Sequence, residues 1–166
     1  MTKGVLPQDL VDLAERVVHE NAAIGRKVAV AESCTGGLVC AALTEIPGSS
    51  EVLERGFVTY SNDAKINMLD VASDIIETFG AVSIACAWAM ARGALSHSDA
   101  DVAVAISGIA GPDGGSELKP VGTVVFSRAL RGDDGEKDGE MRQLGDLGRS
   151  GVRHQAALVA LELLLP

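Results

Sequence analysis

The sequence predicts an α/β fold in which a mixed sheet lies between layers of helices. Two short runs, residues 28–31 and 102–106, contain only Val, Ala and Ile, as expected of central strands covered on both faces. Each run ends in a polar segment that contains glycine. Segments with apolar residues at helical spacing precede the first run and close the chain. This alternation of buried strands and amphipathic helices is typical of an α/β domain.

Hydrophobic spacing and turn residues predict the individual elements. In chain order they are helix 7–24, strand 28–31, helix 37–43, a short helix from Ser49 or Ser50 through Leu53, strand 56–60, helix 65–69, helix 81–95, strand 102–106, strand 121–130, strand 141–144 and helix 149–165. Pro7 suits the first turn of the first helix and Gly25 its end. The charged turn 131–139 indicates a hairpin between the last two strands.

The helix predicted over residues 81–95 is apolar on nearly every side, interrupted only by Ser83 and Arg92. A helix of this composition is buried on more than one face. The sequence alone leaves open whether a second subunit contributes to that burial.

Composition and charge limit the class of protein. The chain has 166 residues, 47% of them hydrophobic, which we interpret as one globular domain over residues 1–166. The net charge of -9 argues against nucleic acid as a partner, because phosphate neutralisation needs clustered Lys and Arg. A small anionic substrate remains compatible, since a few arginines can dominate the field inside a cleft.

Other features predict a cytoplasmic protein without a metal or cofactor. The three cysteines have no CxxC spacing, so neither a disulfide framework nor a zinc site is expected. No apolar run approaches the about 18 residues of a membrane span. The first ten residues contain no apolar segment typical of a secretion signal.

Two glycine-flanked polar loops, residues 33–37 and 107–115, follow the two apolar strands and predict a reactive site. Glycine lets backbone N–H groups approach an oxyanion or a phosphate without a Cβ in the way. Ser33 is the candidate nucleophile, and Cys34 is the alternative. Glu32 is interpreted as a buried hydrogen-bonding partner of the first loop.

A serine nucleophile requires a base, and Lys65 is the candidate. It lies five residues after Tyr60, just past a predicted strand, where desolvation could lower its pKa. The alternative is a solvated lysine at the start of a helix. The three histidines, His19, His97 and His154, are predicted to be surface residues.

Arg149 and Arg153 are spaced i, i+4 in the first turns of the closing helix, so they share one face. Together with the helix N-terminus they could hold a phosphate or a carboxylate. The alternative is a pair of surface arginines near Asp146.

Five motifs in order along the chain resemble the CinA C-terminal domain family: A-E-S-C-T-G-G (31–37), Y-S-N-D-A-K (60–65), S-G-I-A-G-P-D-G-G (107–115), K-P-V-G-T-V (119–124) and G-R-S-G-V-R (148–153). The resemblance implies a three-layer α/β/α sandwich and the hydrolysis of nicotinamide mononucleotide to nicotinate mononucleotide and ammonia, in pyridine nucleotide salvage. It also implies a homo-oligomer, commonly a dimer.

The resemblance assigns Ser33 as the nucleophile, Lys65 as the base and Tyr60 as its helper. Our hypothesis is a metal-independent reaction that proceeds through an acyl-enzyme. Backbone N–H groups of residues 34–37 would hold the oxyanion. The expected substrate-binding residues are Cys34, Thr35, Gly36, Gly37, Ser107, Gly108, Ala110, Gly111, Arg149 and Arg153.

Two other functions are compatible with the sequence. One is a non-catalytic module that binds a nucleotide or a partner and retains the fold. The other is an acidic scaffold protein that assembles through the 81–95 helix. Ligand-induced stabilisation without product would indicate the first, and no response to nucleotides would indicate the second.

Overall fold

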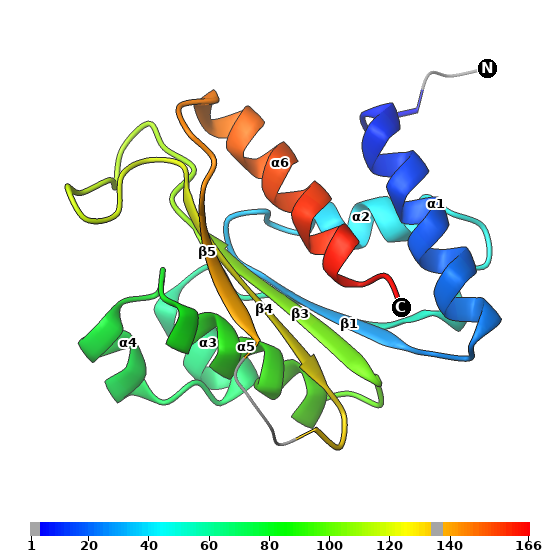
Figure 1. Cartoon of the computed structure of the whole chain (residues 1–166). Coiled ribbons are helices and arrows are strands. Elements are labelled where there is room, and N and C mark those ends of the chain that lie inside the picture. Colours follow the sequence, from blue (N-terminus) through cyan, green and yellow to red (C-terminus); the bar gives the residue numbers. More distant parts are fainter. Residues whose placement is uncertain (1–3, 134–137) are drawn as a thin grey trace.

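The computed structural model describes residues 4–133 and 138–166, and it contains a five-stranded sheet in the order β2-β1-β3-β4-β5 with helices on both faces (Figure 1). In chain order the elements are α1 (Gln8–Ala23), β1 (Val28–Glu32), α2 (Leu38–Thr44), the 3₁₀ helix η1 (Ser49–Glu51), β2 (Leu53–Val58), α3 (Asn62–Leu69), α4 (Ser73–Phe79), α5 (Ile84–Ser96), β3 (Val102–Gly108), β4 (Thr123–Leu130), β5 (Gly139–Gln143) and α6 (Gly148–Leu163). The predicted α/β class with a mixed sheet is confirmed.

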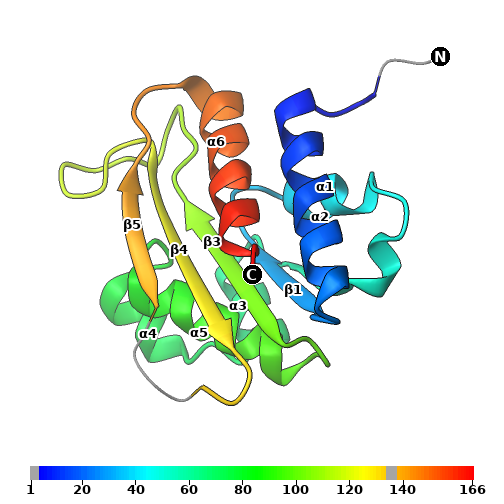
Figure 2. The ribbon, with the colours of Figure 1, turned by 45° about the vertical axis from the view of Figure 1, so that its right-hand side comes forward.

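The helices lie in two layers, one on each face of the sheet (Figures 1 and 2). The two faces differ in the size of the side chains that pack against these helices. Val28, Val30 and Val104 pack with α1, α2 and α6, whereas the intervening Ala29 and Ala103 pack with α5. Side chains alternate between the faces of a strand, so the Val-Ala repeat separates the two cores. Small residues on both the sheet and α5 permit close packing on the second face.

Helix α5 also packs closely against α3, and the glycine on it explains how. A Cβ on Gly93 would lie 2.0 Å from the backbone oxygen of Leu69, the last residue of α3. Contacts with the sheet, α3 and α4 therefore account, within this chain, for the burial of α5 on several sides.

The sheet topology brings three loops to one edge. β1 pairs in parallel with both β2 and β3, and Glu32 at the end of β1 lies opposite Val58 and Ile106. β4 and β5 complete the sheet as an antiparallel hairpin. The carboxyl ends of β1, β2 and β3 therefore meet, and the segments that follow them lie side by side.

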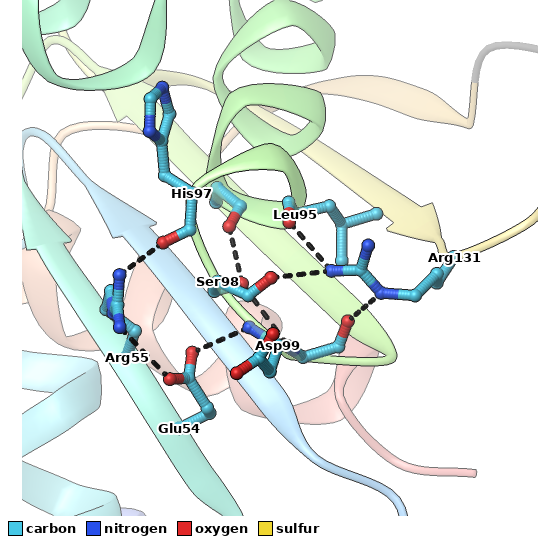
Figure 3. A network of polar contacts seen from close by, with 9 residues as sticks. Glu54, Arg55, Leu95, His97, Ser98, Asp99 and Arg131 are labelled. Carbon is cyan, nitrogen blue, oxygen red and sulfur yellow. Dashed lines mark hydrogen bonds and ion pairs between the residues drawn. The ribbon is translucent and has the colours of Figure 1, made fainter.

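At the opposite edge of the sheet a polar network fixes the connection between α5 and β3 (Figure 3). Arg131 donates to the backbone oxygens of Leu95, Ser98 and Ala100 at 2.7, 2.8 and 2.7 Å. The backbone N–H of Asp99 donates to Glu54 of β2 at 3.2 Å. These bonds join the amino ends of β2 and β3 to the carboxyl end of the antiparallel strand β4, at the side of the sheet away from the carboxyl ends of β1, β2 and β3.

Several predicted boundaries differ from the observed ones. β2 begins at Leu53, which we expected in a short helix, and it ends at Val58. α3 begins three residues earlier than predicted, because the Ser61 side chain accepts the Ala64 N–H and caps the helix. In contrast, α5 begins three residues later than predicted, at Ile84, because the Ser83 side chain accepts the Cys86 N–H and caps the helix there.

The sequence analysis did not predict helix α4, but it did predict the hairpin of β4 and β5. The seven residues of α4 include no fully buried side chain, so they carry only a weak amphipathic pattern. The predicted hairpin of residues 121–130 and 141–144 corresponds to β4 and β5. Residues 134–137 of its charged turn lie outside the described residues. No helix in the described part of the chain is long and apolar enough to cross a membrane.

Candidate active site

Ser33 follows β1 directly and begins a tight turn. Its backbone N–H donates to Ile106 of β3 at 2.9 Å, so it continues the strand, and its backbone oxygen accepts the Gly36 N–H at 3.0 Å. Gly36 and Gly37 both have positive φ angles, +59° and +99°, which L side chains rarely adopt. The turn that leads into α2 therefore depends on the two glycines. Ser33 is 7% exposed.

The carboxylate of Glu32 accepts hydrogen bonds from backbone amides at the start of α2. The side chain is fully buried and accepts the backbone N–H groups of Gly37, Val39 and Cys40 at 3.1, 3.2 and 3.0 Å. These are the amides that a helix start leaves without backbone partners. The interpretation of Glu32 as a buried partner of the loop is confirmed, and these amides are already satisfied within the protein.

Lys65 reaches Ser33 from α3. Its Nζ lies 3.0 Å from Ser33 Oγ, 2.8 Å from the backbone oxygen of Thr59 and 3.3 Å from that of Tyr60. The side chain is 1% exposed, and all three partners are uncharged oxygens. Burial lowers the pKa of the lysine, because desolvation disfavours the ammonium form. A lysine in this position is suited to accept the Ser33 proton.

Cys34, the alternative nucleophile, is in a poor environment for a thiolate. The residue is 5% exposed, and burial raises the pKa of its thiol to about 11. A cysteine attacks as the thiolate, so at neutral pH this thiol is almost entirely unreactive. The chemistry of the turn therefore favours Ser33.

Ser33 and Lys65 line a cavity of about 300 Å³ at the carboxyl edge of the sheet. The lining residues are Ser33, Cys34, Tyr60, Asn62, Lys65, Ala81, Val82, Ser107, Gly108, Ile109, Ala110, Gly111, Asp113, Gly114 and Arg149. Sequence reasoning did not single out Asn62, Ala81, Val82, Ile109, Asp113 or Gly114. Asn62 and Asp113 lie within the quoted motifs, whereas Ala81 and Val82 precede α5 and carry no chemical signal.

Tyr60 contributes to the site through two different groups. Its backbone oxygen contacts Lys65, whereas its phenol oxygen accepts Arg149 Nη2–H at 2.9 Å. Arg149 also donates through Nη1 to the backbone oxygen of Gly111 at 2.7 Å. The tyrosine side chain and the arginine thus join the α3 side of the cavity to the 107–115 loop.

The structure separates the two arginines of α6. Arg149 lines the cavity, whereas Arg153 binds the back of the Ser33 turn. Arg153 donates through Nε to the backbone oxygen of Cys34 at 3.0 Å and through Nη2 to that of Thr35 at 3.1 Å. Thr35 is fully buried and, like Gly36, Gly37 and Arg153, is not among the cavity-lining residues.

Histidines and metal ligands do not take part in this arrangement. His97 contacts Asp70 at 2.6 Å and His154 contacts Asp9 at 2.9 Å, and neither histidine lines the cavity. In residues 4–133 and 138–166, no three His, Cys, Asp or Glu side chains are grouped so as to hold a metal ion.

The chain is similar to a known protein family, to named relatives and to solved structures. The family model described as the CinA C-terminal domain matches residues 10–166. The nicotinamide-nucleotide amidohydrolase PncC of Escherichia coli K12 is 50% identical over 156 residues, which are 94% of this chain and 93% of that protein.

Other relatives are longer than this chain. The putative competence-damage inducible protein of Caldicellulosiruptor bescii is 49% identical over 83% of this chain but only 33% of its own length. That of Symbiobacterium thermophilum is 51% identical over 84% and 34%. The chain therefore spans about a third of the length of these two relatives.

Solved structures share the whole fold. The competence/damage inducible protein CihA of Agrobacterium tumefaciens superposes with a TM-score of 0.92 and is 48% identical, covering 98% of this chain and 97% of that one. A CinA superfamily protein of Escherichia coli superposes with a TM-score of 0.87 at 31% identity, covering 99% and 94%.

Proposed function

This chain belongs to the CinA C-terminal domain family, and we propose that it hydrolyses the carboxamide of nicotinamide mononucleotide to nicotinate mononucleotide and ammonia. The observation that carries the proposal is the 3.0 Å contact between Lys65 Nζ and Ser33 Oγ, buried in the wall of a cavity of about 300 Å³. The 50% identity to an amidohydrolase of nicotinamide nucleotides supports the choice of substrate.

In the proposed mechanism the neutral lysine is oriented by two backbone oxygens. An uncharged amine has two N–H donors and one lone pair. The oxygens of Thr59 and Tyr60 take the two donors, which turns the lone pair toward Ser33 Oγ. The serine hydroxyl then donates its proton to Lys65 as Oγ attacks the carboxamide carbon.

The reaction proceeds through an acyl-enzyme. After attack, the Lys65 ammonium returns the proton to the amide nitrogen, the C–N bond breaks, and ammonia leaves with Ser33 esterified to the nicotinoyl group. A water molecule then attacks the ester carbon and gives a proton to Lys65, which returns it to Ser33 Oγ as nicotinate mononucleotide is released. We propose that Tyr60 assists Lys65 in both acylation and deacylation, because its backbone oxygen accepts an N–H of the lysine.

The oxyanion of each tetrahedral intermediate needs N–H donors near Ser33. The amides of Gly36 and Gly37 are already bonded within the protein, to Ser33 and Glu32. Among the described residues, no acceptor is bonded to the amides of Cys34 and Thr35. Cys34 lines the cavity, whereas Thr35 is fully buried and does not, so we assign the Cys34 amide to the oxyanion, with a contribution of about 10²- to 10³-fold in rate.

The remaining polar groups of the cavity would bind the nucleotide. Arg149 is an exposed arginine that lines the cavity, and we assign the 5′-phosphate to it. The 107–111 segment, with Ser107, Gly108, Ala110 and Gly111 on the cavity wall, would hold the ring and the ribose. A guanidinium at this place allows an anionic substrate despite the net charge of -9.

The wider setting is also part of the proposal. We propose that residues 1–166 act as one amidohydrolase domain in the cytoplasm, as a homo-oligomer, in pyridine nucleotide salvage and without a cofactor. Neither nucleic acid nor a membrane is proposed as a partner.

The test is ammonia release from nicotinamide mononucleotide by the purified protein and by its Ser33→Ala variant. We expect release by the parent and none by the variant, while the unfolding free energy changes little because only one buried hydroxyl is lost. Release by both proteins would contradict the serine mechanism. Thermal stabilisation by the nucleotide without ammonia would indicate a non-catalytic binding module.

A further inference from the structure

We propose that Arg153 is a positioning residue of the nucleophile turn rather than a ligand of the substrate phosphate. The inference rests on the proposed amidase function and concerns the same site. It starts from the two arginines of α6, which the i, i+4 spacing places on one face of the helix. Their contacts differ. Arg149 lies against the cavity, whereas Arg153, one helical turn further along α6, lies against the backbone that follows Ser33.

Arg153 is bound to two consecutive backbone oxygens. Nε donates to Cys34 and Nη2 donates to Thr35, at 3.0 and 3.1 Å. A planar guanidinium that donates from two nitrogens fixes both the position and the direction of its partners. These bonds occupy the Nε–Nη2 edge, one of the two edges through which a guanidinium can bind a phosphate. What distinguishes the two arginines is that Arg149 lines the cavity and Arg153 does not.

Holding these oxygens also directs the amides of the same peptides. The peptide bonds of the turn are trans, since the Gly111–Pro112 bond is the cis bond identified in the described residues. In a trans peptide the N–H points opposite to the C=O. The Thr35 N–H is therefore turned away from Arg153 and α6. The Cys34 N–H is directed in the same manner by the Ser33 oxygen, which accepts the Gly36 N–H at 3.0 Å.

Glu32 holds the other end of the same turn. Its fully buried carboxylate binds the Gly37, Val39 and Cys40 amides. The segment between Glu32 and α2 is therefore held at its end by the Glu32 carboxylate and at its middle by the Arg153 guanidinium. The two side chains act on opposite backbone groups, carbonyls for Arg153 and amides for Glu32. Between them lie the amides of Cys34 and Thr35, to which no acceptor in residues 4–133 and 138–166 is bonded.

Two substrates and one pair of variants separate positioning from phosphate binding. We compare Arg153→Met with Arg149→Met in the hydrolysis of nicotinamide mononucleotide and of nicotinamide riboside, which lacks the phosphate. We expect Arg153→Met to lower kcat/KM for both substrates by the same factor, about 100-fold, as for a misplaced oxyanion donor. Most of that loss should be in kcat. Arg149→Met should lower kcat/KM for the mononucleotide alone.

Two further variants complete the comparison. Arg153→Lys keeps the charge but not the two-nitrogen fork, so it should recover only a small part of the lost kcat. Arg16→Met makes the same change at an exposed ion pair on α1 and should leave both reactions unchanged. If Arg153→Met slowed the mononucleotide reaction and left the riboside reaction unchanged, Arg153 would be a phosphate ligand and the inference would be wrong.

A substrate-independent measurement keeps this inference separate from the identity of the substrate. A fluorophosphonate probe phosphonylates an activated serine: the Ser33 Oγ–P bond forms, fluoride leaves and the serine proton passes to Lys65. The P=O oxygen of the product takes the place that the oxyanion of the amide intermediate would occupy. We expect Ser33 to be labelled at least tenfold more slowly in Arg153→Met than in the parent. An equal labelling rate would overturn the inference. Labelling without ammonia release from either nicotinamide compound would instead contradict the proposed substrate.

Discussion

Replacing Lys65 by methionine should change how the stability of the protein depends on pH. Lys65 is 1% exposed, and burial lowers its pKa in the folded protein, whereas an unfolded chain has the ordinary value of 10.5. Between the lowered pKa and 10.5 the folded lysine is neutral and the unfolded one is protonated. The unfolded state then binds one more proton, so the unfolding free energy rises with pH in this window.

The slope follows from linkage. One proton corresponds to about 1.4 kcal/mol per pH unit, and Lys65→Met has no such contribution. The parent should therefore gain stability relative to the variant by about 1.4 kcal/mol for each pH unit in the window. With a urea m-value of about 2 kcal/mol/M, this is a relative shift of about 0.7 M in the unfolding midpoint per unit. The difference in unfolding free energy between the parent and the variant should not change with pH below the pKa of folded Lys65, nor above pH 10.5.

Urea unfolding of both proteins at half-unit steps from pH 7 to 10.5 measures this difference. Other titrating groups are common to the two proteins and cancel, including Cys34, whose pKa of about 11 keeps it neutral over most of the range. Lys27→Met serves as the control, because Lys27 is exposed. Midpoint curves for the parent and Lys65→Met that stay parallel throughout would refute the argument that the folded lysine is a ready base.

Two further substitutions test other parts of the site. Glu32→Gln should destabilise the protein by about 1–3 kcal/mol, measured by urea unfolding, because its NH₂ group would face a buried backbone N–H that the carboxylate now binds; an unchanged midpoint would contradict this. Cys34→Ala should keep ammonia release within about threefold of the parent, because a thiol with a pKa of about 11 is not the nucleophile; loss of release comparable to that of Ser33→Ala would assign the attack to the sulfur instead.

The parts of the fold that the sequence predicted are those whose local pattern has one explanation. The Val-Ala repeats of β1 and β3 are buried on both faces, and an apolar run this short, ended by polar residues and glycine, is typical of a central strand. The start of β2 was misassigned because Leu53 is adjacent to a genuine 3₁₀ helix, and its place in the sheet is determined by pairing with Val28. Pairing partners far along the chain are not visible in a local window.

The site shows the same distinction between local and distant information. Ser33 and Lys65 were paired on chemical type, and the parallel register of β1 with β2 explains why two residues 32 positions apart in the chain make a 3.0 Å contact. The i, i+4 spacing of Arg149 and Arg153 predicted a shared helix face correctly. It did not reveal that this face meets a cavity at one arginine and backbone oxygens at the other, because those surfaces belong to other elements.

The environment of Lys65 indicates that this residue serves function, because burying its amine lowers the stability of the fold. A buried amine whose partners are neutral oxygens has no carboxylate to offset its desolvation, so folding it at neutral pH costs about 1.4 kcal/mol for each unit by which its pKa is lowered. Elsewhere the chain satisfies buried charge more fully, as Glu32 does with three amides. Local costs of this kind are concentrated at functional sites. The pH-dependent stability of Lys65→Met therefore measures the same property, a low folded pKa, that the proposed reaction requires of this residue.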